Sequence, residues 1–421
     1  MTRLRLLVCV LWAWLSLTAA AWVDAADPTW RALPDLPRSD GAITGMGVDS
    51  GGTLWVMTNT APEDLSWPTR ELFWWDGTKW QEPKNADEVE GDFFYCLYGG
   101  GKRGLYAVYW SKERAAVRDD PAKLCKLVEG EVKLVMEYTH ASWLDPRVTY
   151  EGAFPSAGLH VARDGRLFTY GEGFLEIYLE GRWKLLARPK QPTSVSFVEQ
   201  GDLIHIVYDK FLCTVSPDGM AVTRELDGLT DDGLGCAENA VLWGDDALLV
   251  VSPARPQPVN LHAYEIETGK PIDIEDVKTA LEGKVVIDAM SAPDGSVWLC
   301  AVDAIFRTFL VVSVDNAGSL RVLSTDGDVF ELDELSAVSW WIERTRWYPS
   351  STLTASDGTF WLAPTEGGLL ACKDGAFTRY GIDDLSAERI NFLAEGKDGT
   401  IYAAATSKVH ALTPTDDVEG K

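Results

Sequence analysis

The stretch TASDGTFWLAP (354–364) carries the pattern on which the fold prediction depends. A short apolar run leads into a turn of Asp and Gly, and a run of aromatic and aliphatic residues follows. Asp and Gly favour the backbone conformations of a tight hairpin turn, whereas aromatic and β-branched residues favour strands. The stretch therefore predicts two antiparallel strands joined by a short turn.

The same phrase recurs along the chain. Clear copies are GVDSGGTLWVMT (47–58), HVARDGRLFTYG (160–171), MSAPDGSVWLCA (290–301) and AEGKDGTIYAAA (394–405), and weaker ones are YGGGKRGLYAVYW (98–110), VEQGDLIHIVYD (198–209) and LWGDDALLVVS (242–252). A second hairpin follows most copies, as in FLEIYLEGRWKLLA (174–187) and GLLACKDGAFTRYG (368–381). Two hairpins in series form a four-stranded antiparallel meander, which is the repeating blade of a β-propeller.

The first turns of the repeats give the number of blades. They fall at Gly52, Gly104, Gly165, Asp202, Asp246, Gly295, Gly358 and Gly399, which predicts an all-β propeller of eight four-stranded blades, with seven as the alternative. The last repeat lacks a fourth strand, and TWRALPDLP (29–37) resembles one. We therefore expect the N-terminal strand to complete the last blade and close the ring, which removes open sheet edges. The alternative is that residues 27–40 are a loose leader.

The repeated phrase, DG followed by a hydrophobic residue and Trp, resembles the two-component regulator propeller repeat and is similar to the repeats of streptogramin lyase-like propellers. The resemblance extends over nearly the whole chain after residue 25 and is most specific at Asp357–Tyr380. Regulator propellers are periplasmic sensors joined to a membrane span and a kinase. This chain ends soon after its last predicted strand, so we expect a free-standing propeller without a kinase, in contrast to the family. Lyase activity would require clustered His and Glu residues with a bound metal, and no such cluster maps onto this sequence.

The first 25 residues are predicted to be a signal peptide. Arg3 and Arg5 precede an apolar run, Leu6–Leu17, and small residues permit cleavage after Ala21 or after Ala25. The apolar run is too short to span a bilayer, and no second long run occurs. We expect residues 26–414 to form one propeller domain and 415–421 a C-terminal tail. The mature protein is then secreted or periplasmic, with no membrane insertion.

The composition limits the partners. The formal net charge of −26 disfavours binding to nucleic acid and to anionic lipid. Solubility explains such a charge most simply, and a patch for a basic partner or a cation is the alternative. We expect a monomer that binds a small molecule, a carbohydrate or a protein.

Cysteine and histidine residues give no catalytic or metal-binding pattern. Six cysteines remain after signal removal, far apart and without CxxC spacing, so buried thiols are expected, with a Cys96–Cys125 disulfide as the alternative. The five histidines lie in five separate segments. His160, His205 and His410 fall within predicted strands, where a lone histidine is usually a hydrogen-bonded core residue. No catalytic residue, metal site or cofactor is predicted.

The lengths of the connections point to one face of the ring. If the strands of a blade are called A to D, the A–B and C–D turns share one face and the B–C and D–A connections share the other. The A–B and C–D turns are almost all tight. The insertions fall in B–C connections (59–70, 110–123, 252–260) and in D–A connections (139–152, 275–284, 326–350). Long insertions gathered on one face of a repeat protein often mark a binding face; neutral drift of loop length is the alternative.

The richest insertion is SWWIERTRWYPS (339–350). Aromatic faces bind sugars and cations, and arginine binds carboxylates in a bidentate manner. The candidate ligand-binding residues in the insertions are Trp340, Trp341, Arg344, Arg346, Trp347, Tyr348, Trp67, Arg70, Trp110, Trp143 and Arg147. For each tryptophan, packing beneath the loops is the alternative, and Trp55, Trp298 and Trp361 are expected to pack between blades because they share the repeat position.

These observations favour a secreted or periplasmic propeller that binds a ligand or protein partner through its long-loop face and has no enzymatic activity. A lyase or hydrolase acting near the central channel is one alternative. A structural component of a cell-envelope complex is another.

Overall fold

The structure, a computed structural model, describes residues 30–37, 42–60, 69–85, 94–100, 103–109, 121–139, 158–171, 173–190, 195–229, 239–252, 260–291, 295–303, 309–322, 352–363, 369–373, 376–380 and 390–413. The predicted signal peptide and the C-terminal tail lie outside these residues. The one helix in the described part is α2 (Glu275–Ala280), and it is far too short to span a membrane.

The described strands form eight four-stranded antiparallel sheets, so the eight-blade prediction is confirmed and the seven-blade alternative is wrong. Blades 1 to 4 consist of β2 (Ala42–Val48), β3 (Leu54–Thr60), β4 (Thr69–Trp75), β5 (Trp80–Gln81); β6 (Phe94–Gly99), β7 (Leu105–Tyr109), β8 (Pro121–Val128), β9 (Glu131–Thr139); β10 (Gly158–Val161), β11 (Leu167–Gly171), β12 (Phe174–Leu179), β13 (Arg182–Ala187); and β14 (Val195–Gln200), β15 (Leu203–Tyr208), β16 (Phe211–Val215), β17 (Ala221–Glu225).

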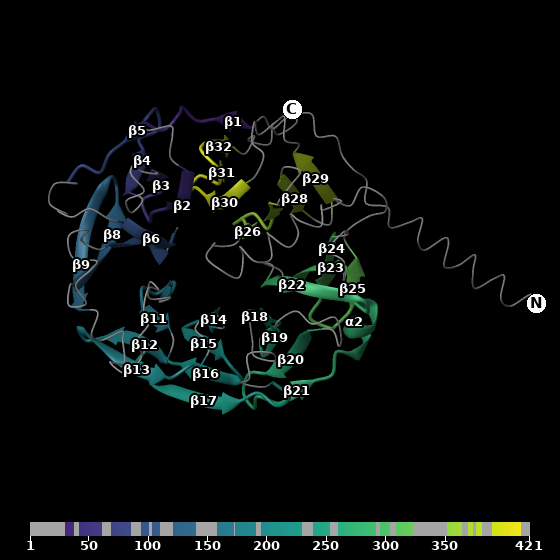
Figure 1. Cartoon of the computed structure of the whole chain (residues 1–421). Helices are drawn as coiled ribbons and strands as arrows, with labels where there is room; N and C mark the ends of the chain where they lie inside the picture. Colours follow the sequence, from purple (N-terminus) through teal and green to yellow (C-terminus); the bar gives the residue numbers. More distant parts are fainter. Residues whose placement is uncertain are drawn as a thin grey trace, which may run out of the picture.

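Blades 5 to 8 continue the ring. They consist of β18 (Asn239–Trp243), β19 (Ala247–Val251), β20 (Leu261–Glu265), β21 (Pro271–Ile272); β22 (Lys284–Ser291), β23 (Val297–Asp303), β24 (Phe309–Val314), β25 (Leu320–Val322); β26 (Thr352–Thr354), β27 (Phe360–Leu362), β28 (Leu369–Lys373), β29 (Ala376–Tyr380); and β30 (Ile390–Glu395), β31 (Ile401–Ala405), β32 (Val409–Leu412), with β1 (Arg31–Ala32) as its fourth strand. The first strands of the blades surround the centre of the ring and the fourth strands form its outer wall (Figure 1).

The Asp-Gly signal of the sequence corresponds to one repeated turn. In blade 7 the Gly358 amide donates to the carbonyl of Ala355, and the Ala355 amide donates to that of Thr359. Gly358 adopts a φ of 84°, which favours glycine. The Asp357 carboxylate accepts the Thr359 amide at 2.9 Å. Aspartate thus fixes the residue that follows the glycine, which explains why the pair recurs in the sequence.

The hydrophobic core lies between neighbouring blades rather than within one. The repeat-position tryptophans confirm this: Trp55 is fully buried between blades 1 and 2, and Trp361 is 5% exposed between blades 7 and 8. Trp298 of blade 6 packs on Phe360 of blade 7, with ring centroids 4.8 Å apart. Each blade therefore depends on its neighbours for burial.

The N-terminal segment closes the ring, as the sequence predicts. Residues Arg31 and Ala32 pair with Ala411 and His410 of β32, and the Leu33 amide donates to the Val409 carbonyl. The pairing is shorter than the predicted 29–37 because Pro34 and Pro37 have no amide hydrogen to continue the ladder. Thr29 lies outside the described residues.

Side chains of the same segment fasten it to blades on both sides. Trp30 packs edge-on against Trp361 and Tyr380 of blade 7, with ring centroids 5.9 Å and 5.6 Å apart. Toward blade 1, the Trp80 indole donates to the Pro34 carbonyl at 2.8 Å, and Leu33 is buried. The closing segment thus contacts three blades although its strand spans two residues.

Cysteine residues follow the predicted pattern where they are described. Cys125 and Cys213 are buried thiols outside any disulfide, so the Cys96–Cys125 alternative is wrong. Burial raises the pKa of Cys125 to about 11, which keeps the thiol protonated and unreactive at neutral pH. Cys372 is also buried.

Candidate functional site

The two faces of the ring differ in the length of their connections. Antiparallel order places the A–B and C–D turns on one face, which we call the tight-turn face, and the B–C and D–A connections on the other, the long-loop face. Between the described strands, no connection on the tight-turn face exceeds five residues. On the long-loop face the D–A connection between Val322 and Thr352 has 29 residues. The predicted asymmetry between the faces is therefore confirmed.

The candidate residues of the long-loop face mostly lie outside the described residues. These are Trp67, Trp110, Trp143, Arg147, Trp340, Trp341, Arg344, Arg346, Trp347 and Tyr348. Arg70 is different, because β4 already begins at Thr69 and Arg70 is in register with Asn59. The 59–70 insertion is thus shorter than predicted, since strand pairing extends further toward the loop. Whether the eleven residues converge stays a prediction.

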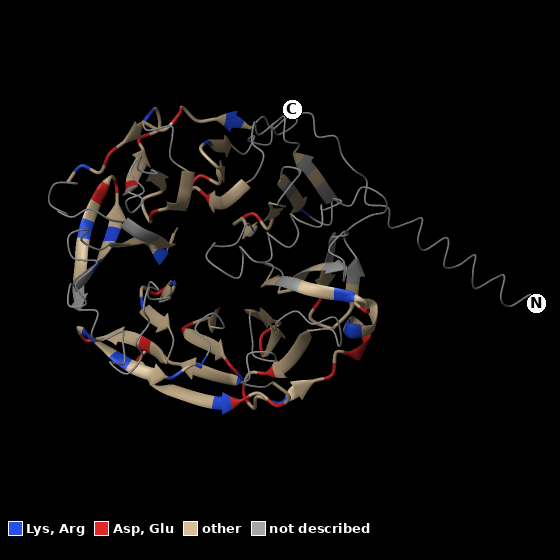
Figure 2. Ribbon diagram, viewed as in Figure 1, with Lys and Arg blue, Asp and Glu red and all other residues tan. Residues whose placement is uncertain are grey.

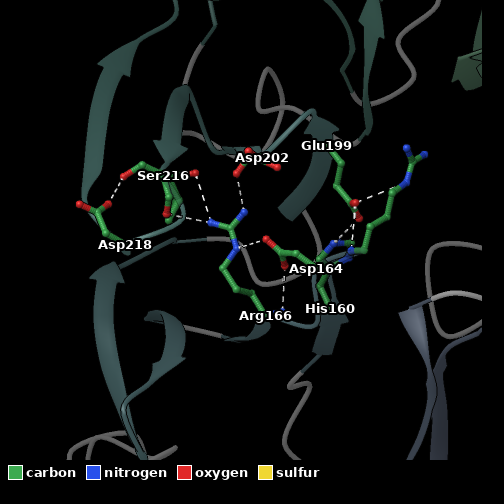
Figure 3. Close-up of polar contacts among 9 residues, drawn as sticks. His160, Asp164, Arg166, Glu199, Asp202, Ser216 and Asp218 are labelled. Atoms are coloured by element: carbon green, nitrogen blue, oxygen red, sulfur yellow. Dashed lines mark hydrogen bonds and ion pairs between the residues drawn. The ribbon is translucent and has the colours of Figure 1, made fainter.

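The tight-turn face carries a cluster that the sequence did not reveal. It centres on Glu199, near the end of β14, whose side chain is only 7% exposed. Its carboxylate lies 3.2 Å from Arg103 of blade 2, and 3.4 Å and 3.5 Å from His160 and Arg163 of blade 3. The Arg163 backbone amide donates to it at 3.1 Å. We call these four residues the Glu199 cluster; Figure 3 shows Glu199 and His160 directed toward one another.

The position of His160 is set by stacking. Its ring lies parallel to Phe197 of β14, with an interplanar angle of 5° and centroids 4.2 Å apart. Phe197 and Glu199 occupy the same face of β14, because alternate residues of a strand point the same way. One strand of blade 4 therefore holds both the ring that supports the imidazole and the carboxylate that faces it.

Burial and charge act oppositely on the two titratable groups. Burial lowers the pKa of His160, although the Glu199 carboxylate opposes the shift, so the imidazole is neutral at pH 7. Burial alone would raise the pKa of Glu199, but His160, the Arg103 charge and the Arg163 amide together lower it. At pH 7 the Glu199 cluster thus contains one carboxylate and two guanidinium groups, with a net positive charge.

Arg166, in the same turn as Arg163, has a different role. Its side chain is 10% exposed, and its guanidinium lies 2.6 Å from the Asp164 carboxylate. It also donates to the carbonyls of Ser216 at 2.8 Å and Asp202 at 2.7 Å (Figure 3). Arg166 therefore joins the turns of blade 4 to blade 3, and its hydrogen-bonding capacity is used within the fold.

Another polar pair lies near the long-loop face. Ser252 Oγ, at the end of β19, is 3.4 Å from His262 Nε2 of β20. Burial lowers the pKa of His262 to about 4, and among the described residues its ring has no carboxylate partner. The pair thus lacks the third group that would orient a general base. Within the described residues, no three His, Cys, Asp or Glu side chains are grouped as metal ligands.

Sequence reasoning missed the Glu199 cluster for a physical reason. Its members come from three blades, and contacts between neighbouring blades leave no periodic pattern in the sequence. His160 was predicted to be a hydrogen-bonded core residue in a strand, and the strand placement is confirmed. The available signal was two arginines in A–B turns of consecutive repeats, at GKRG (101–104) and ARDG (162–165), in an otherwise acidic chain.

Comparison with known proteins finds similar folds at low identity. No family model matches the chain, and no curated protein matches it. The extracellular domain of the putative hybrid two-component system BT4673 from B. thetaiotaomicron is 11% identical, with a TM-score of 0.45 over 93% of this chain and 40% of that one. This chain thus spans about 40% of the length of the BT4673 domain.

Other propellers are similar over more of their own length. YCF48 bound to D1 peptide is 11% identical, with a TM-score of 0.45 over 94% of this chain and all of that one. The WD40 propeller domain of Doa1 is 10% identical, with a TM-score of 0.41. Similarities at this level concern the fold and say nothing of a ligand.

Proposed function

We propose that the protein is a secreted or periplasmic binding propeller without enzymatic activity, which holds a ligand or protein partner on its long-loop face. The observation that carries this proposal is the asymmetry of the ring. Every A–B and C–D connection is short, whereas long segments enter and leave the strands on the opposite face alone. A rigid ring that presents variable segments on one side is the usual arrangement of a recognition surface.

The composition of those segments supports recognition of a sugar or a peptide. The segment 339–350 contributes three tryptophans, a tyrosine and two arginines to a chain with a net charge of −26. Tryptophan rings stack on sugar faces, and arginine recognises carboxylates. The acidic surface repels nucleic acid, and we expect the protein to be a monomer.

The proposal also includes the extracytoplasmic location. The first 25 residues have the basic, apolar and small-residue regions of a signal peptide. Export is tested by expressing the full chain and sequencing the N-terminus of the protein recovered outside the cytoplasm. A new N-terminus at residue 22 or 26 is expected. Recovery of an uncleaved cytoplasmic chain would contradict the location.

The binding proposal is tested on a carbohydrate array and a peptide array. The purified protein is compared with the double variants W340A/W341A and R344A/R346A, and with R182A as a control on the outer strand β13. Binding to one array is expected, with at least tenfold loss in one double variant and none in the control. Equal binding by all forms, or turnover of a bound probe, would contradict the proposal.

A further inference from the structure

The tight-turn face contains a second feature that the long-loop proposal does not use. The Glu199 cluster lies where the β6–β7, β10–β11 and β14–β15 turns meet, close to the centre of the ring. Figure 2 shows a basic segment beside the end of β6 at this place. On a chain of net charge −26, two arginines that converge from neighbouring blades form a local positive site.

The two arginines of the cluster retain unused donors, in contrast to Arg166. A guanidinium has five N–H groups. The Arg163 side chain is 73% exposed, and within the described residues its only polar contact is to Glu199 at 3.5 Å. Arg103 is 36% exposed and contacts Glu199 at 3.2 Å. The nearby Arg166 is largely buried, and its guanidinium donates to four oxygens.

The Glu199 contacts are also long for ion pairs. In a charge-assisted hydrogen bond the nitrogen and oxygen are usually about 2.7–2.9 Å apart. In the same turn, Arg166 Nε lies 2.6 Å from Asp164 Oδ2. In the described part of the chain, Glu199 Oε1 is buried yet accepts no hydrogen bond of good geometry, and His160 Nε2 likewise has no hydrogen-bond partner. Glu199 thus orients the arginines without saturating them.

From these contacts we propose that the Glu199 cluster binds a ligand carboxylate on the tight-turn face. The ligand lies on the solvent side of Arg103 and Arg163, and both guanidinium groups donate to it. The planar fork of arginine fits a carboxylate, and the internal partner of both arginines is already a carboxylate. Glu199 is then a positioning residue, and its negative charge also weakens the binding of the anion. This site is separate from the long-loop face and does not depend on it.

The proposal is tested by calorimetric titration of the purified protein with citrate at low ionic strength. Alanine at Arg163 is expected to weaken binding about tenfold, and R103A/R163A should abolish it. Glu199→Gln keeps the shape and removes the competing charge, so it should tighten citrate binding severalfold. A structural role of Glu199 alone predicts the opposite sign for E199Q. R182A, which removes an exposed charge on β13, should bind as the unchanged protein does.

Controls separate the outcomes. Thermal melting of each variant shows that the fold is kept, and His160→Gln provides a second variant in which both arginines remain. Titration with sulfate at equal ionic strength tests the preference for carboxylate. No citrate binding, binding that survives R103A/R163A, weaker binding by folded E199Q, or equal affinity for sulfate would each overturn the proposal.

Discussion

A single buried carboxylate, that of Asp49, joins two blades at their turns. It accepts the amides of Gly51 and Thr53 at 2.9 Å each and the Trp55 indole at 3.0 Å, all within blade 1. It also accepts the Glu129 amide of blade 2 at 2.8 Å. The side chain that shapes the first turn is therefore also a link between neighbours.

Replacement of Asp49 should be costly. D49A leaves four N–H groups without their acceptor, one of them the indole of the fully buried Trp55, and should lower the free energy of unfolding by about 3 kcal/mol. D398A, in an exposed turn where the carboxylate accepts the Thr400 amide, is the matched control and should cost less than about 1 kcal/mol. Urea denaturation measures both. Equal losses would show that the link between blades contributes nothing.

Buried histidines make the stability depend on pH. His205 is fully buried, with its ring nitrogens 3.0 Å from Thr214 Oγ1 and 2.8 Å from Gln200 Oε1. Burial, aided by Arg224, lowers the pKa of His205 to about 4 from its usual 6.5. The unfolded chain thus binds the proton more readily than the folded one. The stabilisation is present above pH 6.5 and is lost as the pH falls toward 4, by about 3 kcal/mol.

The variant H205Q isolates this effect. Glutamine keeps a hydrogen-bonding side chain but takes up no proton. The free energy of unfolding of H205Q should therefore fall less steeply between pH 6.5 and 4 than that of the unchanged protein. The difference between the two slopes should correspond to about one proton taken up on unfolding. Urea denaturation at a series of pH values measures the two slopes. Parallel slopes would mean that His205 does not titrate on unfolding.

At the level of elements, the closing segment concentrates stability in few residues. Trp30 fills the interface of blades 7 and 8 beside Trp361 and Tyr380, and Leu33 and Leu36 are buried against blade 1. A strand of two residues could not hold the ring by its ladder alone, so side-chain burial supplies most of the attachment.

Removal of the Trp30 ring should loosen the closure specifically. W30A is expected to destabilise the fold by about 2 kcal/mol and to speed hydrogen exchange at β32 and at the Leu33 amide. W183A removes a tryptophan that packs on Tyr178 in blade 3, away from the closure, and should leave exchange at β32 unchanged. Equal exchange at β32 in the two variants would contradict the assignment of Trp30 to the closure.

The elements were largely predictable from the sequence because their determinants are local. Each Asp-Gly turn fixes its own hairpin, as at Asp357 and Gly358. The predicted strand ends were less accurate. Strand β3 extends to Thr60 and pairs there with Thr69 of β4, and both residues lie inside the predicted insertion 59–70. The site on the tight-turn face was not predictable, because Arg103, His160 and Glu199 meet through contacts between blades.

At the scale of the whole molecule, the fold separates two surfaces. The short turns of one face hold a positive cluster of fixed geometry, and the opposite face carries the long segments in which the aromatic residues lie in the sequence. Both surfaces depend on a closed ring, because an open end would leave the interface of blades 7 and 8 without Trp30 and expose an edge of β32.

Ring closure by the N-terminal strand is therefore the central claim, and a designed disulfide tests it directly. Ala32 and His410 are opposite one another in the β1–β32 pair, at a separation that a disulfide can bridge. The double variant A32C/H410C should form an intramolecular disulfide under mild oxidation, detected by peptide mapping, and should melt at a higher temperature oxidised than reduced. The pair A32C/L185C, which joins β1 to the outer strand of blade 3, should not cross-link. Free thiols in A32C/H410C, or cross-linking of both pairs alike, would contradict the closure.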